Sequence, residues 1–152
     1  MLQILIGISG SGKSTYVRSK NKRHFTIVCP DDIRLNLTGD VSDQTRNKEV
    51  WKIAYETLEI SLGMGEDVIF DSTACNIETI KQLVEFAEKY HTEFCFKLFY
   101  SIPEVSNKRI QTDIKKGINR ANVPYEVLIK QYSGFKNVES YLLEKYSNLI
   151  VF

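Results

Sequence analysis

The stretch of the chain that is richest in chemistry is Gly7-Ile8-Ser9-Gly10-Ser11-Gly12-Lys13-Ser14, which fits the phosphate-binding pattern G-x-x-x-x-G-K-[ST] at every fixed position. An apolar run, residues 2–8, leads into it, and a helix-compatible run, residues 13–19, follows. Glycines let the backbone curl with its N–H groups pointing inward, and the following helix adds the positive end of its dipole. The stretch therefore predicts a binding site for a nucleoside triphosphate.

The loop divides the work of holding ATP and its metal among a few groups. Lys13 is expected to reach the β- and γ-phosphate oxygens, and the Ser14 hydroxyl is expected to ligate the Mg²⁺ that bridges them. The residues predicted to contact the nucleotide are Gly7, Ser9, Gly10, Ser11, Gly12, Lys13, Ser14 and Thr15.

A second group of candidates follows a short apolar run, residues 25–29. Asp31 is the predicted general base, because a carboxylate beside the γ-phosphate can take the proton of an attacking hydroxyl. Asp32 competes for this role, and Asp31 could instead only cap a short helical turn. Arg34, one helical turn on, is expected to bind an anion on the acceptor or simply to pair with Asp31 or another carboxylate.

Asp71 ends a third apolar run and has the position of a Walker B aspartate, which holds Mg²⁺ or orients Ser14. In a motor ATPase a glutamate would normally follow, to polarise water. Here Ser72 and Thr73 follow, so the sequence argues against ATP hydrolysis as the end in itself.

Three cations surround a glycine-broken loop in the last crossover: Arg109, Lys116 and Arg120. In a phosphoryl transferase such a loop can close as a lid and place a cation on the transferring phosphoryl group. The alternative is a solvated basic loop, and the sequence does not select one residue of the three.

These residues need a scaffold that brings them together. Apolar runs predict strands, and periodic runs between them predict helices. Ser101 and Glu104 form a predicted capping box, which starts the first helix of the last crossover. The predicted strands are 2–8, 25–29, 67–70, 93–100 and 148–152. Besides the helix that starts at this capping box, the predicted helices are 13–19, 43–62, 76–90, 124–131 and 138–145. The alternation predicts an α/β, P-loop kinase-type three-layer sandwich with a five-stranded parallel sheet and a lid in the last crossover. In such a sheet the ligands lie at the carboxyl ends of the strands, where Asp31, Asp71 and the phosphate loop all emerge.

Length and composition bound the rest. The 152 residues are expected to form a single domain, 1–152, and 43% hydrophobic with 26% charged residues is typical of a soluble globular protein. A net charge of +1 gives no global basic field for nucleic acid, so such binding would need local patches. The three cysteines, Cys29, Cys75 and Cys95, favour neither a disulfide framework nor a zinc site and suit a reducing cytoplasm. No run is long enough to span a membrane.

With these motifs in order, the chain resembles the polynucleotide 5′-hydroxyl kinase family, and in particular the kinase half of the phage end-healing kinase-phosphatases. The similarity is carried by the phosphate loop, Asp31-Asp32-x-Arg34, Asp71-Ser72-Thr73 and Val123-Pro124. It implies transfer of the ATP γ-phosphate to a 5′-OH end of DNA or RNA. It also implies that Asp31 activates that hydroxyl and Arg34 grips the phosphate just inside the end. The lid cation would be Arg109 or lie between Lys116 and Arg120.

Two other functions remain open from the sequence. A P-loop kinase for a small acceptor, such as a nucleotide, sugar or antibiotic, would share every phosphate-handling residue, and a nucleotide-dependent switch or ATPase would transfer phosphate only to water. The preference for DNA or RNA, the oligomeric state and the presence of a separate ligase or phosphatase are not determined by these motifs.

Overall fold

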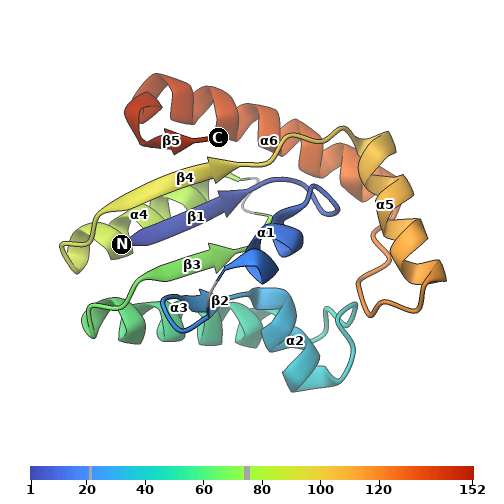
Figure 1. The fold of residues 1–152 in the computed structure, drawn as a ribbon, viewed down its shortest axis with the longest axis horizontal. Helices are drawn as coiled ribbons and strands as arrows, with labels where there is room; N and C mark the ends of the chain where they lie inside the picture. The colour runs from blue at the N-terminus through green and yellow to red at the C-terminus, as the bar shows by residue number, and fades with distance from the viewer. Residues whose placement is uncertain (21, 74–75) are drawn as a thin grey trace.

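The computed structural model describes residues 1–20, 22–73 and 76–152, and its central feature is one five-stranded sheet (Figure 1). All strand pairs are parallel, and the strand order is β2-β3-β1-β4-β5. The strands are β1 (Leu2–Ile6), β2 (Thr26–Val28), β3 (Val68–Asp71), β4 (Phe94–Leu98) and β5 (Ile150–Val151). The predicted α/β class and parallel sheet are confirmed.

The central strands are buried because helices cover the sheet. Leu2 of β1 pairs with Val68 of β3 on one side and with Phe94 of β4 on the other. Every residue of β3 is buried, as expected for a parallel strand covered on both faces.

Helices lie on the two faces and beyond the carboxyl ends of the strands (Figure 1). The main core joins one face of the sheet to α3 (Asn47–Gly63), α4 (Ile77–Lys89) and α6 (Tyr125–Lys145). A smaller core under α1 (Lys13–Ser19) lies on the other face. The two remaining helices, α2 (Pro30–Thr38) and α5 (Pro103–Lys115), begin just after β2 and β4, respectively. They lie at the edge of the sheet where the predicted site residues gather.

The end of the chain differs from the prediction. Residues 124–131 and 138–145 belong to one helix, α6, which runs without a break through Gly134. Its apolar stripe is continuous across that glycine, since Leu128, Phe135, Val138 and Leu142 are all buried. Tertiary burial therefore outweighs the helix-breaking tendency of a single glycine. A 3₁₀ turn, η1 (Ser147–Leu149), takes up the start of the predicted last strand.

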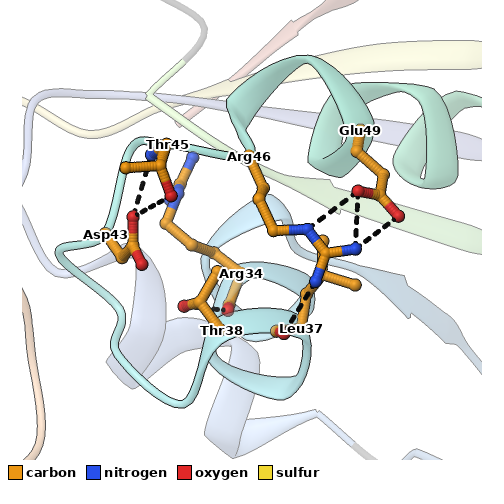
Figure 2. Close-up of polar contacts among 7 residues, drawn as sticks. All are labelled: Arg34, Leu37, Thr38, Asp43, Thr45, Arg46 and Glu49. Carbon is orange, nitrogen blue, oxygen red and sulfur yellow. Dashed lines mark hydrogen bonds and ion pairs between the residues drawn. The ribbon is translucent and has the colours of Figure 1, made fainter.

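Helix α3 begins later than the prediction of residue 43. Asp43 accepts hydrogen bonds from the backbone N–H and the hydroxyl of Thr45, at 2.9 and 2.6 Å (Figure 2). Such local side-chain bonds favour a turn over the first turn of a helix. The segment before Asn47 is therefore a loop.

The predicted Ser101 to Glu104 capping box is wrong. Helix α5 starts with Pro103, which has no N–H to cap, and the Ser101 hydroxyl lies 2.8 Å from that of Ser106. Glu104 accepts a hydrogen bond from Tyr125 Oη at 2.7 Å, which ties α5 to α6.

The starts of α2 and α4 differ in how they are capped. Asp31 does not cap α2, because Cys29 precedes the helix and Pro30 is its first residue, so Asp31 lies in the first turn. Asn76 does cap α4, its Oδ1 accepting a hydrogen bond from Thr79 N at 2.9 Å. None of the helices that the described residues form is both long and apolar enough to cross a membrane.

The single long α6 makes a testable prediction. Phe135→Ala removes a ring that is 2% exposed and is expected to lower the free energy of unfolding by about 3–5 kcal/mol, measured by chemical denaturation. Leu143→Ala, on the same helix but 52% exposed, is the matched control and is expected to change it by less than about 0.5 kcal/mol. Equal effects of the two variants would contradict the docking of α6 on the sheet.

Candidate active site

The turn between β1 and α1 contains two positions whose backbone conformation only glycine adopts easily. Gly10 and Gly12 have φ angles of +76° and +106°, in the region that side chains disfavour. A Cβ atom on Gly10 would also lie 2.8 Å from the carbonyl oxygen of Ser106, because α5 packs directly behind the loop. The loop is therefore held in a curled shape by its neighbours as well as by its own sequence.

Lys13 is buried inside this loop. Its Nζ donates hydrogen bonds to the carbonyl oxygens of Gly7 and Ile8, at 2.7 and 3.0 Å. Ser14 and Thr15, in the first turn of α1, are exposed. The arrangement places an ammonium group within the loop and two hydroxyls at a helix N-terminus, which is a setting that favours polyphosphate.

Asp71, the last residue of β3, is buried at the same edge of the sheet. Burial raises the pKa of its carboxyl; the charge of Lys13 opposes this, and the charges of Asp31 and Asp32 add to it. The Cys29 thiol is a neighbour of the Asp71 carboxyl, and burial, together with the charge of Asp71, raises the pKa of that thiol. Asp31, Asp71 and the phosphate loop lie at the carboxyl ends of the strands, as predicted. The sequence did not predict that Cys29 lies beside Asp71.

Arg34 is buried, not open to solvent. Its Nη1 forms an ion pair with Asp31 and its Nη2 donates to Asn47 Oδ1 at 2.7 Å. Its Nε is buried with no hydrogen-bond partner among the described residues. Asp31 itself is 65% exposed, so the pair presents a carboxylate on the surface backed by a buried guanidinium.

Polar contacts join the end of α2 to the loop before α3 (Figure 2). The Thr38 hydroxyl donates to the carbonyl oxygen of Arg34 at 2.8 Å, which secures the end of α2. Arg46 pairs with Glu49 and also donates to the carbonyl oxygen of Leu37 at 3.2 Å. These bonds tie the loop before α3 to the end of α2.

The three lid candidates have different surroundings. Arg109 Nη1 donates to the carbonyl oxygen of Gly10 at 3.3 Å, so this side chain touches the phosphate loop. Arg120 is paired with Asp113 across the turn after α5, and Lys116 is exposed at the end of that helix. Of these three residues, Arg109 is the one with a described contact to the phosphate loop.

A pocket of about 350 Å³ opens beside Arg109, between the end of β4, α5 and α6. Most of the side chains that line it are aromatic or aliphatic, and two of them, Arg109 and Lys136, are basic. The lining residues are Tyr100, Ser101, Ile102, Val105, Arg109, Tyr132, Phe135 and Lys136. No sequence motif predicts this pocket, because its residues come from segments that only the fold brings together.

The donor set is compatible with Mg²⁺. Within residues 1–20, 22–73 and 76–152 there is no group of three or more His, Cys, Asp or Glu side chains that could hold a metal. Magnesium, however, often takes one or two protein oxygens and completes its shell with water and phosphate. The Ser14 hydroxyl at the start of α1 and the Asp71 carboxylate at the end of β3 could supply oxygens of that kind.

A parallel sheet of order 2-3-1-4-5 with a glycine-rich lysine loop after β1 defines a P-loop kinase, a class of phosphotransferase. The family model described as "AAA domain" (AAA_33) matches residues 2–138, and the chain belongs to this family.

Individual relatives sharpen the comparison. The chain is 27% identical over 157 residues to a protein of Autographa californica nuclear polyhedrosis virus named "Putative bifunctional polynucleotide kinase/RNA ligase", covering 92% of this chain and 21% of that protein. A chain in the Pnkp1/Rnl/Hen1 RNA repair complex has a TM-score of 0.78 at 24% identity, over 92% of this chain and 45% of that one. A gluconokinase from Sinorhizobium meliloti has a TM-score of 0.55 at 20% identity, over 87% of this chain and 73% of its own. The chain thus resembles a protein named as a polynucleotide kinase/RNA ligase, and it spans less than half of the length of the first two matches.

The loop geometry predicts a strong effect of Gly10→Ala. The added methyl would meet the Ser106 carbonyl at a φ of +76°, so the loop must distort, and the affinity for Mg-ATP is expected to fall at least about tenfold by calorimetry. Gly39→Ala is the matched control, since Gly39 has nearly the same φ, +77°, but open space around it. A Gly39→Ala protein that loses ATP as strongly would show that the loop contact is not the cause.

The buried carboxylate predicts a pH-dependent stability. Because the pKa of Asp71 is raised in the folded state, its ionised form destabilises the protein, and this cost grows as pH rises from the usual aspartate pKa to the raised value. Asp71→Asn is therefore expected to raise the Tm at pH 7, with a difference that shrinks as the pH is lowered towards 4 (about the ordinary aspartate pKa). Glu144→Gln, at an exposed position of α6, is the control and is expected to show no such trend. A lower Tm for Asp71→Asn at neutral pH would mean that Lys13 needs its partner more than burial disfavours the charge.

Proposed function

We propose that the protein is an ATP-dependent polynucleotide 5′-hydroxyl kinase, which transfers the γ-phosphate of ATP to the 5′-OH end of DNA or RNA. The observation that carries the proposal is the position of Asp31. This carboxylate is 65% exposed, and both its charge and that of Lys13 act on the same buried group, Asp71. The polynucleotide kinase named among the relatives supports the choice of acceptor.

On the donor side, the loop amides and Lys13 bind the triphosphate. Ser14 and Asp71 are the residues that would hold Mg²⁺, which neutralises charge on the phosphate oxygens when bound. Lys13 is already desolvated by the loop carbonyls, so its charge acts on the phosphates in a poorly screened environment. The apolar pocket beside Arg109 is suited to the nucleoside part of the donor, because a base can pack on its aromatic walls.

On the acceptor side, Asp31 accepts the proton of the 5′-hydroxyl as its oxygen attacks the γ-phosphorus, and the bond from that phosphorus to the bridging oxygen of the β-phosphate breaks, so that ADP leaves. Its exposure suits an acceptor that is the end of a long chain and need not be enclosed. Arg34 is buried and held by Asp31 and Asn47, so in this proposal its charge acts from behind Asp31 on a phosphate just inside that end.

A cation is also needed where charge develops on the transferring group. Arg109 is the residue proposed for this role, since its guanidinium already touches Gly10. Arg120 is held by Asp113 and would first have to leave this ion pair.

The setting we propose is nucleic-acid end repair in a reducing cytoplasm, with a ligase or phosphatase acting alongside the kinase. The name of the viral relative joins a polynucleotide kinase to an RNA ligase, and free cysteines at positions 29 and 95 suit a reducing compartment.

The test is to incubate the protein with γ-labelled ATP, Mg²⁺ and 5′-OH oligonucleotides of DNA and of RNA. Label is expected on the 5′-OH oligonucleotide and not on a 5′-phosphorylated one. Asp31→Asn is expected to lower the rate about 100-fold or more, because the substituted amide cannot accept the proton. Asp32→Asn, the neighbouring exposed carboxylate, is the matched control and is expected to keep most of the activity.

Two outcomes would overturn the proposal. ATP turnover without labelled oligonucleotide would indicate an ATPase, and label on gluconate or a nucleoside offered in place of the oligonucleotide would indicate a small-acceptor kinase.

A further inference from the structure

Gln131 of α6 reaches back across the fold to the phosphate loop. Its Oε1 accepts a hydrogen bond from the backbone N–H of Ser9 at 2.9 Å, although 122 positions separate the two residues. The roles described above do not use this side chain. Because Ser9 is in the loop that binds phosphate, the contact connects α6 with the donor site.

The geometry of one peptide explains what this contact can do. Ser9 N–H and the carbonyl of Ile8 belong to the same trans peptide, in which the two groups point in opposite directions. The Ile8 carbonyl accepts from Lys13 Nζ at 3.0 Å, inside the loop. The N–H therefore points outward, away from Lys13, and Gln131 meets it from that side.

Gln131 thus holds the outer end of a peptide whose inner end holds Lys13. Rotation of this peptide would take the Ile8 carbonyl from the buried ammonium of Lys13 and leave the Ser9 N–H without its Gln131 acceptor. The neighbouring part of the loop is held similarly from α5, where Arg109 donates to the Gly10 carbonyl at 3.3 Å. Both helices of the last crossover therefore contact the loop.

We propose that Gln131 is a positioning residue for the donor nucleotide. It fixes the Ile8 to Ser9 peptide and through it the ammonium of Lys13, so that the affinity for the triphosphate depends on α6. This inference rests on the part of the proposed function that places a triphosphate in the loop, and it does not depend on the acceptor.

The test compares Gln131→Met with the wild-type protein. Methionine keeps the length of the side chain but has no oxygen, so the Ser9 amide loses its acceptor. The Kd for Mg-ATP, measured by calorimetry, is expected to rise about fivefold, the worth of one net hydrogen bond. Hydrogen exchange of the Ser9 amide, followed by NMR without nucleotide, is expected to become faster, while that of the Val17 amide in α1 stays unchanged.

Three controls make the result specific. Lys130→Met changes the exposed neighbour on α6 and is expected to alter neither measurement. Gln131→Glu keeps an acceptor oxygen and is expected to preserve the slow exchange of Ser9. In a kinase assay, Gln131→Met is expected to raise the KM for ATP and to leave the KM for the acceptor unchanged.

The inference is overturned if Gln131→Met leaves the Kd for ATP within about twofold of wild type, or leaves Ser9 exchange unchanged. Equal acceleration at Ser9 and Val17 would also overturn it, because that result means general loosening. Since ATP binding is measured without an acceptor, a failure to label oligonucleotides would reject the proposed function and leave this inference standing.

Discussion

The site depends on the interactions that stabilise the buried ammonium group of Lys13. A cation this far from water must be compensated, and the carbonyl oxygens of Gly7 and Ile8 do so from one side while the charge of Asp71 acts from another. Keeping these groups around one nitrogen requires the turn after β1 to stay curled. That requirement explains why α5 packs against Gly10 and why Gln131 of α6 bonds to Ser9.

Charge is arranged differently on the two sides of the edge. Next to the loop, Lys13 and Asp71 are buried, where electrostatic interactions are strong. Further out, Asp31 is exposed but backed by the buried Arg34, which Asn47 and the α2 to α3 hairpin hold in place. In the proposed function, a site of this kind would bind the triphosphate firmly and leave the general base, Asp31, open to a large acceptor.

Stability and activity conflict at this edge. Burial makes ionisation of Asp71 unfavourable, and the exposed carboxylates Asp31 and Asp32 add to the cost. Natural proteins commonly retain such groups where function requires them. The extensive core between the sheet and α3, α4 and α6 is what allows the fold to tolerate them.

The sequence by itself determined the α/β class, the parallel sheet and the edge at which Lys13, Asp31 and Asp71 meet, because strand periodicity and the loop motif are local signals and parallel strands end on one side. It did not determine the single helix α6, the start of α5 or the pairing of Arg120 with Asp113, since these depend on burial and on partners distant in the chain. Nor could it assign Arg109 and Gln131 to the phosphate loop or build the pocket beside them. Those contacts join residues about a hundred positions apart, and only the packing of the last crossover against the first turn decides them.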